Sequence, residues 1–401
     1  MKERNVYILG AGFSACAGAP LIHGFLDRAR GYFDNPDSGL DDYERVQFGN
    51  VFEFRQRMAQ SREKMVIDLD NIEQLFGLAE MSRRLEKKGT KTRNSMVYVI
   101  AKTLELSIES PASERPLLGI PPVSGEDFST RLHLQESRAD NYQYIELYDY
   151  VAGLIAGRLD GESDARKRND AVITFNYDLV LDDALQRIGV RPKYHLSDSD
   201  VDERRNEISL LKLHGSTNWA ICGYCQDKES MRIGDEKMTM RAASWRETVC
   251  PKCSRKEYIP LLIPPSWDKS EYRALMEPVW RKAVEVLSQA TRICCIGYSI
   301  PETDIFFKYL LSLGLAGNPK LYKFVVVDLV PQEDAEARST THKGKPCDVV
   351  ELRYRSLLDD LFQKRRFSFY SMGLVRFVSQ GLFGSELARG TLVKSQLGVL
   401  R

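Results

Sequence analysis

Residues 6–14 read VYILGAGFS, a run of strand-forming apolar residues that ends at Gly10 and Gly12. The small residues that follow suit a helix until Pro20 interrupts it. A strand, a Gly-x-Gly turn and a helix start are typical of an α/β fold that binds a dinucleotide. The first glycine would allow a tight turn, and the second would let backbone N–H groups approach a pyrophosphate. Because Gly-x-Gly occurs in many turns, this stretch predicts a nucleotide site only together with the rest of the chain.

The composition excludes several classes of protein. The 401 residues are 43% hydrophobic, which allows a large core, and the net charge of +1 gives no general attraction to nucleic acid or membranes. No apolar run approaches the roughly 18 residues of a membrane span. The first strand directly follows Lys2, Glu3 and Arg4 without a signal peptide, so we expect a cytoplasmic protein with no membrane contact.

Four of the eight cysteines form two Cys-x-x-Cys pairs, Cys222 with Cys225 and Cys250 with Cys253. In a reducing compartment, two such pairs around a hydrophilic hairpin indicate a tetrahedral zinc ion with four thiolate ligands. A site closed by four protein ligands is expected to be structural and not catalytic. The alternative is four reduced cysteines without a metal.

Other predicted strands also end in polar residues. These strands are 171–175, 208–213, 292–296 and 323–329, and the first three end at Asn176–Asp178, His214–Ser216 and Gly297–Ser299. The carboxyl ends of parallel strands lie at one edge of a sheet, where ligands bind. These three motifs should therefore meet the glycine turn at one site.

The pattern predicts an α/β fold: a Rossmann-like parallel sheet with helices on both faces, a helical insertion and a small four-cysteine zinc ribbon. The predicted parts are a Rossmann-like nucleotide-binding domain at 1–30 and 166–345, a helical insertion at 31–165, a zinc ribbon at 219–263 within the first domain, and a basic C-terminal extension at 346–401. Apolar spacing predicts helices at 67–88, 96–106 and 142–159, and a Pro/Gly-rich composition predicts a loop at 111–127. The cluster Lys364-Arg365-Arg366 is either solvated surface or a contact with a partner protein or nucleic acid.

The motifs, in this order, resemble the sirtuin family. The matching stretches are Gly-Ala-Gly-x-Ser-x-x-x-Gly-x-Pro at Gly10–Pro20, Thr-x-Asn-x-Asp at Thr174–Asp178, Leu213-His214-Gly215, the four cysteines, and Gly-x-Ser at Gly297–Ser299. The resemblance covers about residues 5–30 and 170–330. It implies NAD+ as the bound nucleotide.

Within that family, the chain is most similar to the sirtuin-like NAD+-cleaving effectors of bacterial antiphage defence systems. Thr-x-Asn-Tyr-Asp and Gly-Tyr-Ser-x-Pro-x-x-Asp at Gly297–Asp304 are typical of that branch. Deacylases carry Asp-Phe-Arg where this chain has Leu21-Ile22-His23, and they have Gln where it has Phe175. Both departures argue against acyl-lysine chemistry.

The resemblance implies three catalytic residues, Asn176, Asp178 and His214. Nicotinamide leaves as a neutral molecule, so the site has to stabilise the positive charge of an oxocarbenium-like transition state. Asn176 would position water or the ribose, Asp178 would orient the ribose or stabilise the charge, and His214 would accept a proton. The implied NAD-binding residues are Gly10, Ala11, Gly12, Ser14, Pro20, Gly215, Gly297 and Ser299.

Each of these residues also has a structural alternative. Asn176 and Asp178 could cap a helix that starts near Leu179, and Ser14 could be an N-cap. Ser299 with Glu302 forms a capping-box pattern, which predicts a helix start at Ser299. A histidine at a strand end is often a structural residue, and whether His23 contacts a ligand stays open.

The function expected from the resemblance is hydrolysis of NAD+ to nicotinamide and ADP-ribose by an effector of an abortive-infection defence system. Such an activity has to be restrained in healthy cells, so the resemblance implies a homo-oligomer or a sensor or ATPase partner. A protein deacylase or an ADP-ribosyltransferase is the first alternative and would need a peptide cleft between the zinc ribbon and the sheet. A non-catalytic sensor of NAD+ or ADP-ribose is the second.

Overall fold

The structure is a computed structural model of the whole chain. The residues described are 4–60, 67–86, 89–108, 117–120, 135–136, 143–158, 169–197, 206–225, 227–234, 242–264, 273–301, 304–328, 341–342, 345–346, 349–358, 361 and 366–383. Lys364 and Arg365 of the basic cluster lie outside these residues. No helix within the described ranges has both the length and the apolar content needed to cross a membrane.

A parallel sheet forms the centre of the molecule. Its seven described strands lie in the order β15 (Phe367–Ser371), β12 (Lys323–Asp328), β11 (Arg292–Ile296), β1 (Asn5–Leu9), β5 (Ala171–Thr174), β7 (Glu207–Lys212) and β6 (Arg191–Lys193). All six pairings between them are parallel. β1 is central, with β11 on one side and β5 on the other, so the opening glycine turn lies in the middle of the sheet edge.

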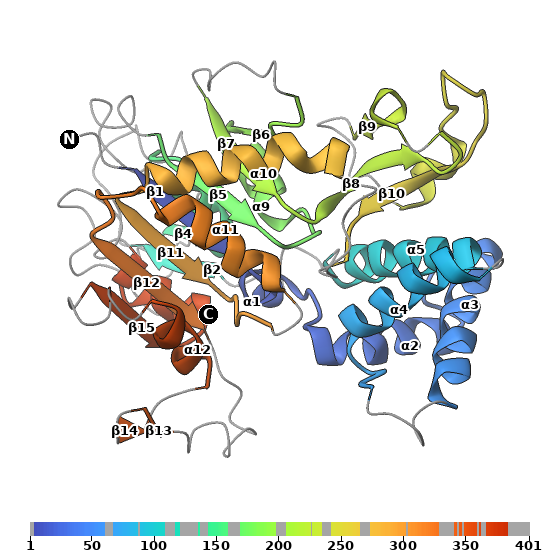
Figure 1. Cartoon of the computed structure of the whole chain (residues 1–401), viewed down its shortest axis with the longest axis horizontal. Helices are drawn as coiled ribbons and strands as arrows, with labels where there is room; N and C mark the ends of the chain where they lie inside the picture. The colour runs from blue at the N-terminus through green and yellow to red at the C-terminus, as the bar shows by residue number, and fades with distance from the viewer. Residues whose placement is uncertain are drawn as a thin grey trace.

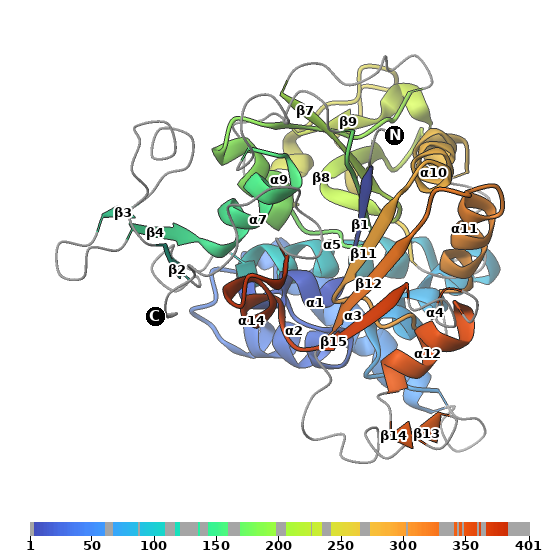
Figure 2. The ribbon, with the colours of Figure 1, turned by 90° about the vertical axis from the view of Figure 1, so that its left-hand side faces the viewer.

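Helices cover both faces of this sheet, and this confirms the predicted fold class. Along β1, Tyr7 and Leu9 face one core while Val6 and Ile8 face the other, as expected for a strand buried on both sides. The first face carries α1 (Ala11–Ser14), α7 (Leu147–Ile155), α9 (Val180–Arg187) and α14 (Leu374–Ser379). The second carries α10 (Arg273–Ser288), α11 (Ile305–Leu315) and α12 (Val349–Leu357). Figure 2 shows α10, α11 and α12 on the side of the strands opposite α7, α9 and α14.

A helical module lies beside the sheet and has its own core (Figure 1). It consists of α2 (Phe25–Asp34), α3 (Asp42–Ala59), α4 (Ile72–Leu85) and α5 (Gly89–Ile108). The last two confirm the predicted helices at 67–88 and 96–106. No helix was predicted over the first two, and the apolar residues along α3 follow only a weak helical period. Helix α3 is instead marked by its start, a capping box between Asp41 and Glu44.

The segment predicted to be a helical insertion is not helical throughout. It contains a three-stranded antiparallel sheet of β2 (Leu117–Ile120), β4 (Gln143–Glu146) and β3 (Gln135–Glu136), which projects to the left in Figure 2. Residues 117–120 of the predicted loop are therefore a strand. The helix predicted at 142–159 begins only at Leu147, and all nine residues of α7 are buried against the main sheet. A helix that is buried all round belongs to a core, and its one charged residue, Asp149, pairs with Arg187.

The described residues beyond 345 include β15, an edge strand of the main sheet. β15 pairs in parallel with β12, and Phe367, Phe369 and Tyr370 are half-buried there. Two further strands, β13 (Thr341–His342) and β14 (Lys345–Pro346), form a small hairpin. The aromatic residues of this tail are sheet residues, because alternate aromatic side chains pack well on both faces of a strand.

The cysteine module follows β7 directly. It is an antiparallel sheet of β8 (Gly215–Cys222), β9 (Arg232–Ile233) and β10 (Tyr258–Leu262), with two 3-10 turns, η4 (Lys228–Ser230) and η5 (Ala242–Glu247). Two more 3-10 turns, η1 (Ala15–Ala17) and η2 (Ile22–Gly24), connect α1 to the helical module. β10 contacts α5, so the cysteine module and the helical module touch.

Candidate active site

A pocket opens where the carboxyl ends of the central strands face the helical module. The space between its walls is about 910 Å³, which includes space open to solvent. Its polar side is formed by Asn176, Asp178, His214, Ser299 and Asp304. Its opposite wall is apolar and comes mainly from the helical module and the turns that lead into it: Ile22, Phe25, Ile72, Phe76, Ile100 and Leu104. Apolar walls with a few convergent polar groups are typical of small-molecule sites.

The glycines at the strand ends bring two backbone segments into contact. Gly10 N–H donates to Ile296 O over 3.0 Å, and Gly12 N–H donates to Gly297 O over 2.9 Å. A Cβ on Gly10 would lie 2.4 Å from Gly297 O. Gly297 has a φ of +62°, and its Cβ would lie 2.3 Å from Phe13 N. No other residue type fits these positions.

The N–H of Gly12 is engaged by Gly297 O, so any backbone N–H groups that approach a pyrophosphate would come from other residues of this turn. The expected helix start is also short, because α1 has four residues and continues as the 3-10 turn η1. The glycine turn thus joins the ends of β1 and β11 and shapes the site from behind.

Asn176 joins the end of β5 to the same turn. Its Nδ2 donates to Gly10 O over 2.8 Å and to Ser14 Oγ over 3.1 Å. Both N–H groups of the amide are therefore engaged, and its carbonyl oxygen is the group that can accept a hydrogen bond from a ligand. Neither contact is with the following helix, so they do not support the alternative that Asn176 caps it.

Asp178 has a capping contact and also lines the pocket. Its Oδ1 accepts a hydrogen bond from Val180 N over 3.1 Å, at the start of α9. Burial raises the pKa of Asp178, and the positive charge of Lys212 and a hydrogen bond with Ser14 oppose that shift. Lys212 is itself buried, and its Nζ donates to Asp178 O over 2.6 Å and to Asp182 Oδ2 over 3.0 Å.

His214 lies at the end of β7, 4% exposed, with its ring edge-to-face against Phe175 at 5.1 Å. Its Nε2 lies 4.0 Å from Asp304 Oδ2. The same carboxylate oxygen accepts a 2.7 Å hydrogen bond from the Tyr298 hydroxyl. Sequence reasoning gave no role to Tyr298 or Asp304. The available signal was their position inside the motif Gly297–Asp304.

The helix start predicted at Ser299 is wrong. α11 begins at Ile305 with Asp304 as its N-cap, and Glu302 of the predicted capping box lies outside the described residues. Pro301 explains the difference, because a residue before proline avoids the helical conformation. Ser299 lines the pocket instead.

The structure brings most of the predicted residues together. Those that line the pocket are Ala11, Pro20, Asn176, Asp178, His214, Gly297 and Ser299. Among the described residues, Gly10, Gly12, Ser14 and Gly215 lie next to it without lining it. Ser14 is 1% exposed and does not cap η1 through its side chain. His23 lies outside the pocket, with its side chain 78% exposed and 3.7 Å from Asp68.

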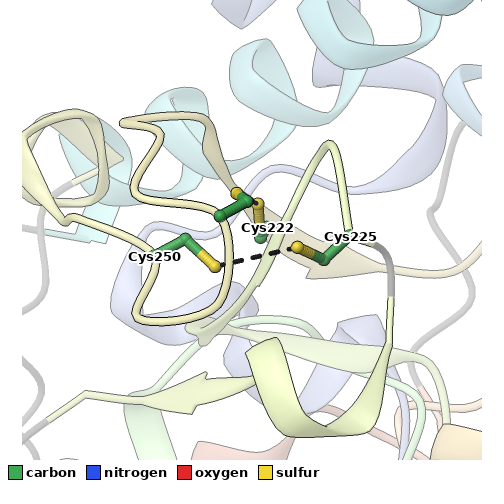
Figure 3. Close-up of side chains that lie close together, drawn as sticks. Cys222, Cys225 and Cys250 are labelled. Atoms are coloured by element: carbon green, nitrogen blue, oxygen red, sulfur yellow. Dashed lines mark hydrogen bonds between the residues drawn. The ribbon is translucent and has the colours of Figure 1, made fainter.

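The four cysteines of the two pairs converge on one point. All four sulfur atoms lie within 4.8 Å of one another, with Cys222 and Cys253 at 3.6 Å and Cys225 and Cys250 at 3.9 Å. Figure 3 shows the sulfur atoms of Cys225 and Cys250 pointing toward each other. Zinc–sulfur bonds of about 2.3 Å in a tetrahedron place sulfur atoms roughly 3.8 Å apart, so this set of donors fits zinc.

The thiols of the cluster differ in how readily they ionise. Desolvation opposes ionisation of Cys250, but hydrogen bonds from the backbone N–H groups of Cys253 and Lys252 lower the pKa of its thiol to about 6, whereas desolvation raises the pKa values of the Cys222 and Cys225 thiols. Trp245 and Tyr258 pack beside the cysteines in a small core. None of the four cysteines lines the pocket, in keeping with a structural site.

Residues 170–345 match the family model of a SIR2-like domain. No curated protein matches the chain. The matching solved structures include a crystal structure of Sir2 in complex with the inhibitor EX-527, 2'-O-acetyl-ADP-ribose and deacetylated p53-peptide. It is 14% identical, covers 95% of this chain and 93% of that one, and has a TM-score of 0.36. A structural similarity this low gives no information about the site.

The SIR2-like segment contains the main polar side of the pocket. Asn176, Asp178, His214 and Asp304 lie within it, as do the four cysteines. The glycine turn after β1, the helical module and the strand β15 lie outside it. The apolar wall of the pocket is therefore contributed mainly by a part of the chain that the family model does not match.

Proposed function

We propose that this chain is a sirtuin-like NAD+ hydrolase that cleaves NAD+ to nicotinamide and ADP-ribose. The observation that carries the proposal is the convergence of Asn176, Asp178 and His214 in one pocket at the carboxyl ends of β5 and β7. The match of residues 170–345 to a SIR2-like domain supports NAD+ as the ligand.

The chemistry requires little acid catalysis. The bond between nicotinamide and C1' of the ribose breaks with both electrons going to the nicotinamide nitrogen, which leaves neutral. The ribose gains positive charge, and the buried Asp178 carboxylate and the Asn176 carbonyl oxygen are suited to stabilise it. Water then bonds to C1', and His214 takes its proton. The proton finally passes to solvent.

The other predicted residues form two groups, which lie in different places and have different proposed roles. Ala11, Pro20, Gly297 and Ser299 line the pocket and are proposed to contact NAD+. Gly10, Gly12, Ser14 and Gly215 are proposed to hold the loops in place. Gly215 has a φ of +87°, and a Cβ there would lie 2.0 Å from Leu261 O. Its substitution would displace the chain next to His214.

Contacts between the modules favour water over an acylated peptide as the acceptor. A deacylase needs a peptide cleft between the cysteine module and the sheet. Here Leu262 of β10 is buried in the core of the helical module. Arg93 donates to Leu262 O over 3.3 Å, and the Tyr177 hydroxyl donates to Ile263 O over 2.8 Å. We propose that these contacts close the space in which such a peptide would bind.

We also propose that Cys222, Cys225, Cys250 and Cys253 hold a structural zinc ion. Zinc would supply the cross-link that a module with so small a core needs in order to fold. β10 of this module leads into Ile263, whose N–H donates to His214 O over 2.8 Å. The ion would thus support the pocket indirectly.

The proposed biological role is that of a cytoplasmic effector in a bacterial antiphage defence system. Depletion of NAD+ would stop an infected cell, and a homo-oligomer or a sensor or ATPase partner would restrain the activity before infection. Residues 1–30 and 166–345 are proposed to act as the NAD-binding domain, with β15 and its flanking helices completing its sheet. Loss of cellular NAD+ and of viability after phage challenge, in cells carrying the chain and its neighbouring genes, would test this role.

The biochemical test is release of nicotinamide and ADP-ribose from NAD+ by the purified full chain, without any peptide. Release by the wild type that is lost in His214→Ala is the expected result. Release only with an acylated peptide would identify a deacylase, and transfer of ADP-ribose to protein would identify a transferase. Tight NAD+ binding with no turnover, even with the defence partners added, would favour the non-catalytic sensor.

A further inference from the structure

Asp304 lines the pocket and does not cap the helix that it precedes through its side chain. Asp304 is the N-cap residue of α11, yet its side chain makes no capping hydrogen bond. It is 1% exposed, lines the pocket and accepts the 2.7 Å hydrogen bond from the Tyr298 hydroxyl. An aspartate usually stabilises a helix start by capping it, and burial of a carboxylate is costly. The position of this side chain therefore calls for another explanation.

The partner that explains it is His214. The 4.0 Å between Asp304 Oδ2 and His214 Nε2 is too long for a hydrogen bond but short enough for strong attraction between a carboxylate and an imidazolium. Both side chains are at most 4% exposed, so little water screens them. An opposite charge at this distance favours the protonated form of a histidine.

Aromatic packing fixes the two groups relative to each other. The ring of Phe175 stacks on Tyr298 at 4.6 Å and meets His214 edge-on at 5.1 Å. Phe307 of α11 meets Tyr298 at 4.7 Å, and the Tyr354 hydroxyl donates to Tyr298 O over 2.6 Å. The tyrosine that holds the carboxylate is thus itself held from three sides. Such rigidity is what a preorganised electrostatic site requires.

We propose that Asp304 is a positioning residue for His214: it stays ionised and stabilises the imidazolium that forms when His214 takes the proton of the attacking water. The role in catalysis rests on the proposed cleavage of NAD+. Asp304 touches neither the substrate nor the water in this scheme, and it changes no bond. It determines how readily His214 accepts the proton, and so it determines the pH range of the reaction.

The other titratable groups that line the pocket are Glu73, Tyr177, Asp178 and Tyr298. Burial raises the pKa values of Tyr177 and Tyr298 well above the usual range, so both stay neutral near pH 7. Besides Asp304, the carboxyl groups of Glu73 and Asp178 can therefore affect the pKa of His214. The effect of Asp304 has to be separated from theirs by substitution at Asp304 itself.

The test is a titration of His214 by NMR in the full-length chain with labelled histidine, in wild type and Asp304→Asn. His214→Ala identifies the signal among the five histidines. We expect the pKa of His214 to fall by about one unit or more in Asp304→Asn. The acidic limb of the pH profile of kcat/KM should move to lower pH by the same amount, and the plateau should fall. A merely structural residue would lower the rate without moving the limb.

Two further variants keep the test decisive. Asp149→Asn removes a buried carboxylate that pairs with Arg187 at 2.7 Å outside the pocket, and it should leave the titration of His214 unchanged. Tyr298→Phe keeps the carboxylate, so its His214 pKa should stay closer to wild type than to Asp304→Asn. An unchanged pKa in Asp304→Asn, or an equal fall in Tyr298→Phe, would overturn the inference. A wild type that shows the pKa shift but never cleaves NAD+ would reject the proposed function alone.

Discussion

The side-chain amide of Asn176 donates to the backbone carbonyl of Gly10 over 2.8 Å, across 166 positions of the chain. Its second N–H reaches Ser14 Oγ. These contacts tie the end of β5 to the turn after β1, and they orient the amide so that its oxygen is left for a ligand. Asn176 thus holds two segments of the pocket together and leaves its side-chain oxygen for a ligand.

Asn176→Ala should therefore reduce both activity and stability. Without the amide, Gly10 O and Ser14 lose their donor, and we expect a loss of about 1 kcal/mol in the free energy of unfolding. NAD+ cleavage should fall by about 100-fold or more, because an oriented polar group at the reacting sugar is lost. Chemical denaturation and a nicotinamide-release assay measure the two effects.

Asn318→Ala is the matched control for that variant. Asn318 Nδ2 also donates to two backbone carbonyls, Leu287 O and Ala290 O, both over 2.8 Å, but it does not line the pocket. Its Oδ1 accepts from Lys320 N and Leu321 N as well, so a loss of stability at least as large as in Asn176→Ala, with NAD+ cleavage kept, is expected. Equal loss of activity in both variants would mean that Asn176 acts through stability alone.

Two glycine-to-alanine substitutions should have opposite effects. A Cβ on Gly297 would lie 2.3 Å from Phe13 N, and its φ of +62° strains any other residue, so Gly297→Ala should unfold or strongly destabilise the chain. Gly31 lies inside α2 with open space around its Cβ position, so Gly31→Ala should raise the free energy of unfolding by roughly 0.5–1 kcal/mol. Thermal melts of the two variants compare them directly. A well-folded Gly297→Ala with wild-type activity would contradict the close contact between the two turns.

The sequence predicts those parts of the fold that are encoded locally. The strand ends and the two cysteine pairs carry their signals within a few residues, and the structure brings them together as expected. β15 was missed because its strand character depends on pairing with β12, about 40 positions away. Asp304 was missed for a similar reason. Its role depends on how the chain turns after Ser299, and the capping-box pattern of Ser299 and Glu302 concealed the true start of α11.

Substitution of a cysteine tests the zinc module. Cys250→Ser should lower the metal content from about one zinc ion per chain to well below one, and the melting temperature should fall by several degrees. Cys16 is a half-buried cysteine outside the cluster, so Cys16→Ser should keep the zinc and most of the stability. Elemental analysis and thermal melts measure both. A wild-type chain purified without zinc, and unable to bind added zinc, would refute the site.

Asp178→Asn should raise the stability of the protein and lower its activity. Burial raises the pKa of Asp178 in the native state, so between the unfolded and native pKa values the native chain binds more protons. Stability therefore falls as the pH rises through that window, and at neutral pH the ionised carboxylate has a net cost. The amide removes this cost. We expect a higher melting temperature than wild type at pH 7, a difference that vanishes below about pH 4, and slower NAD+ cleavage.

Asp182→Asn, in the helix that follows Asp178, should behave in the opposite way. Asp182 pairs with the buried Lys212 at 3.0 Å, and its neutralisation would leave a buried ammonium group without its carboxylate. Breaking such a pair costs about 3–5 kcal/mol. The two variants differ by four positions and carry the same chemical change, so melting temperatures measured from pH 4 to pH 8 separate them. A fall in stability for both at pH 7 would show that Lys212 relies on Asp178 as well, and that the carboxylate proposed to stabilise the sugar is held in its charged form by the lysine behind it.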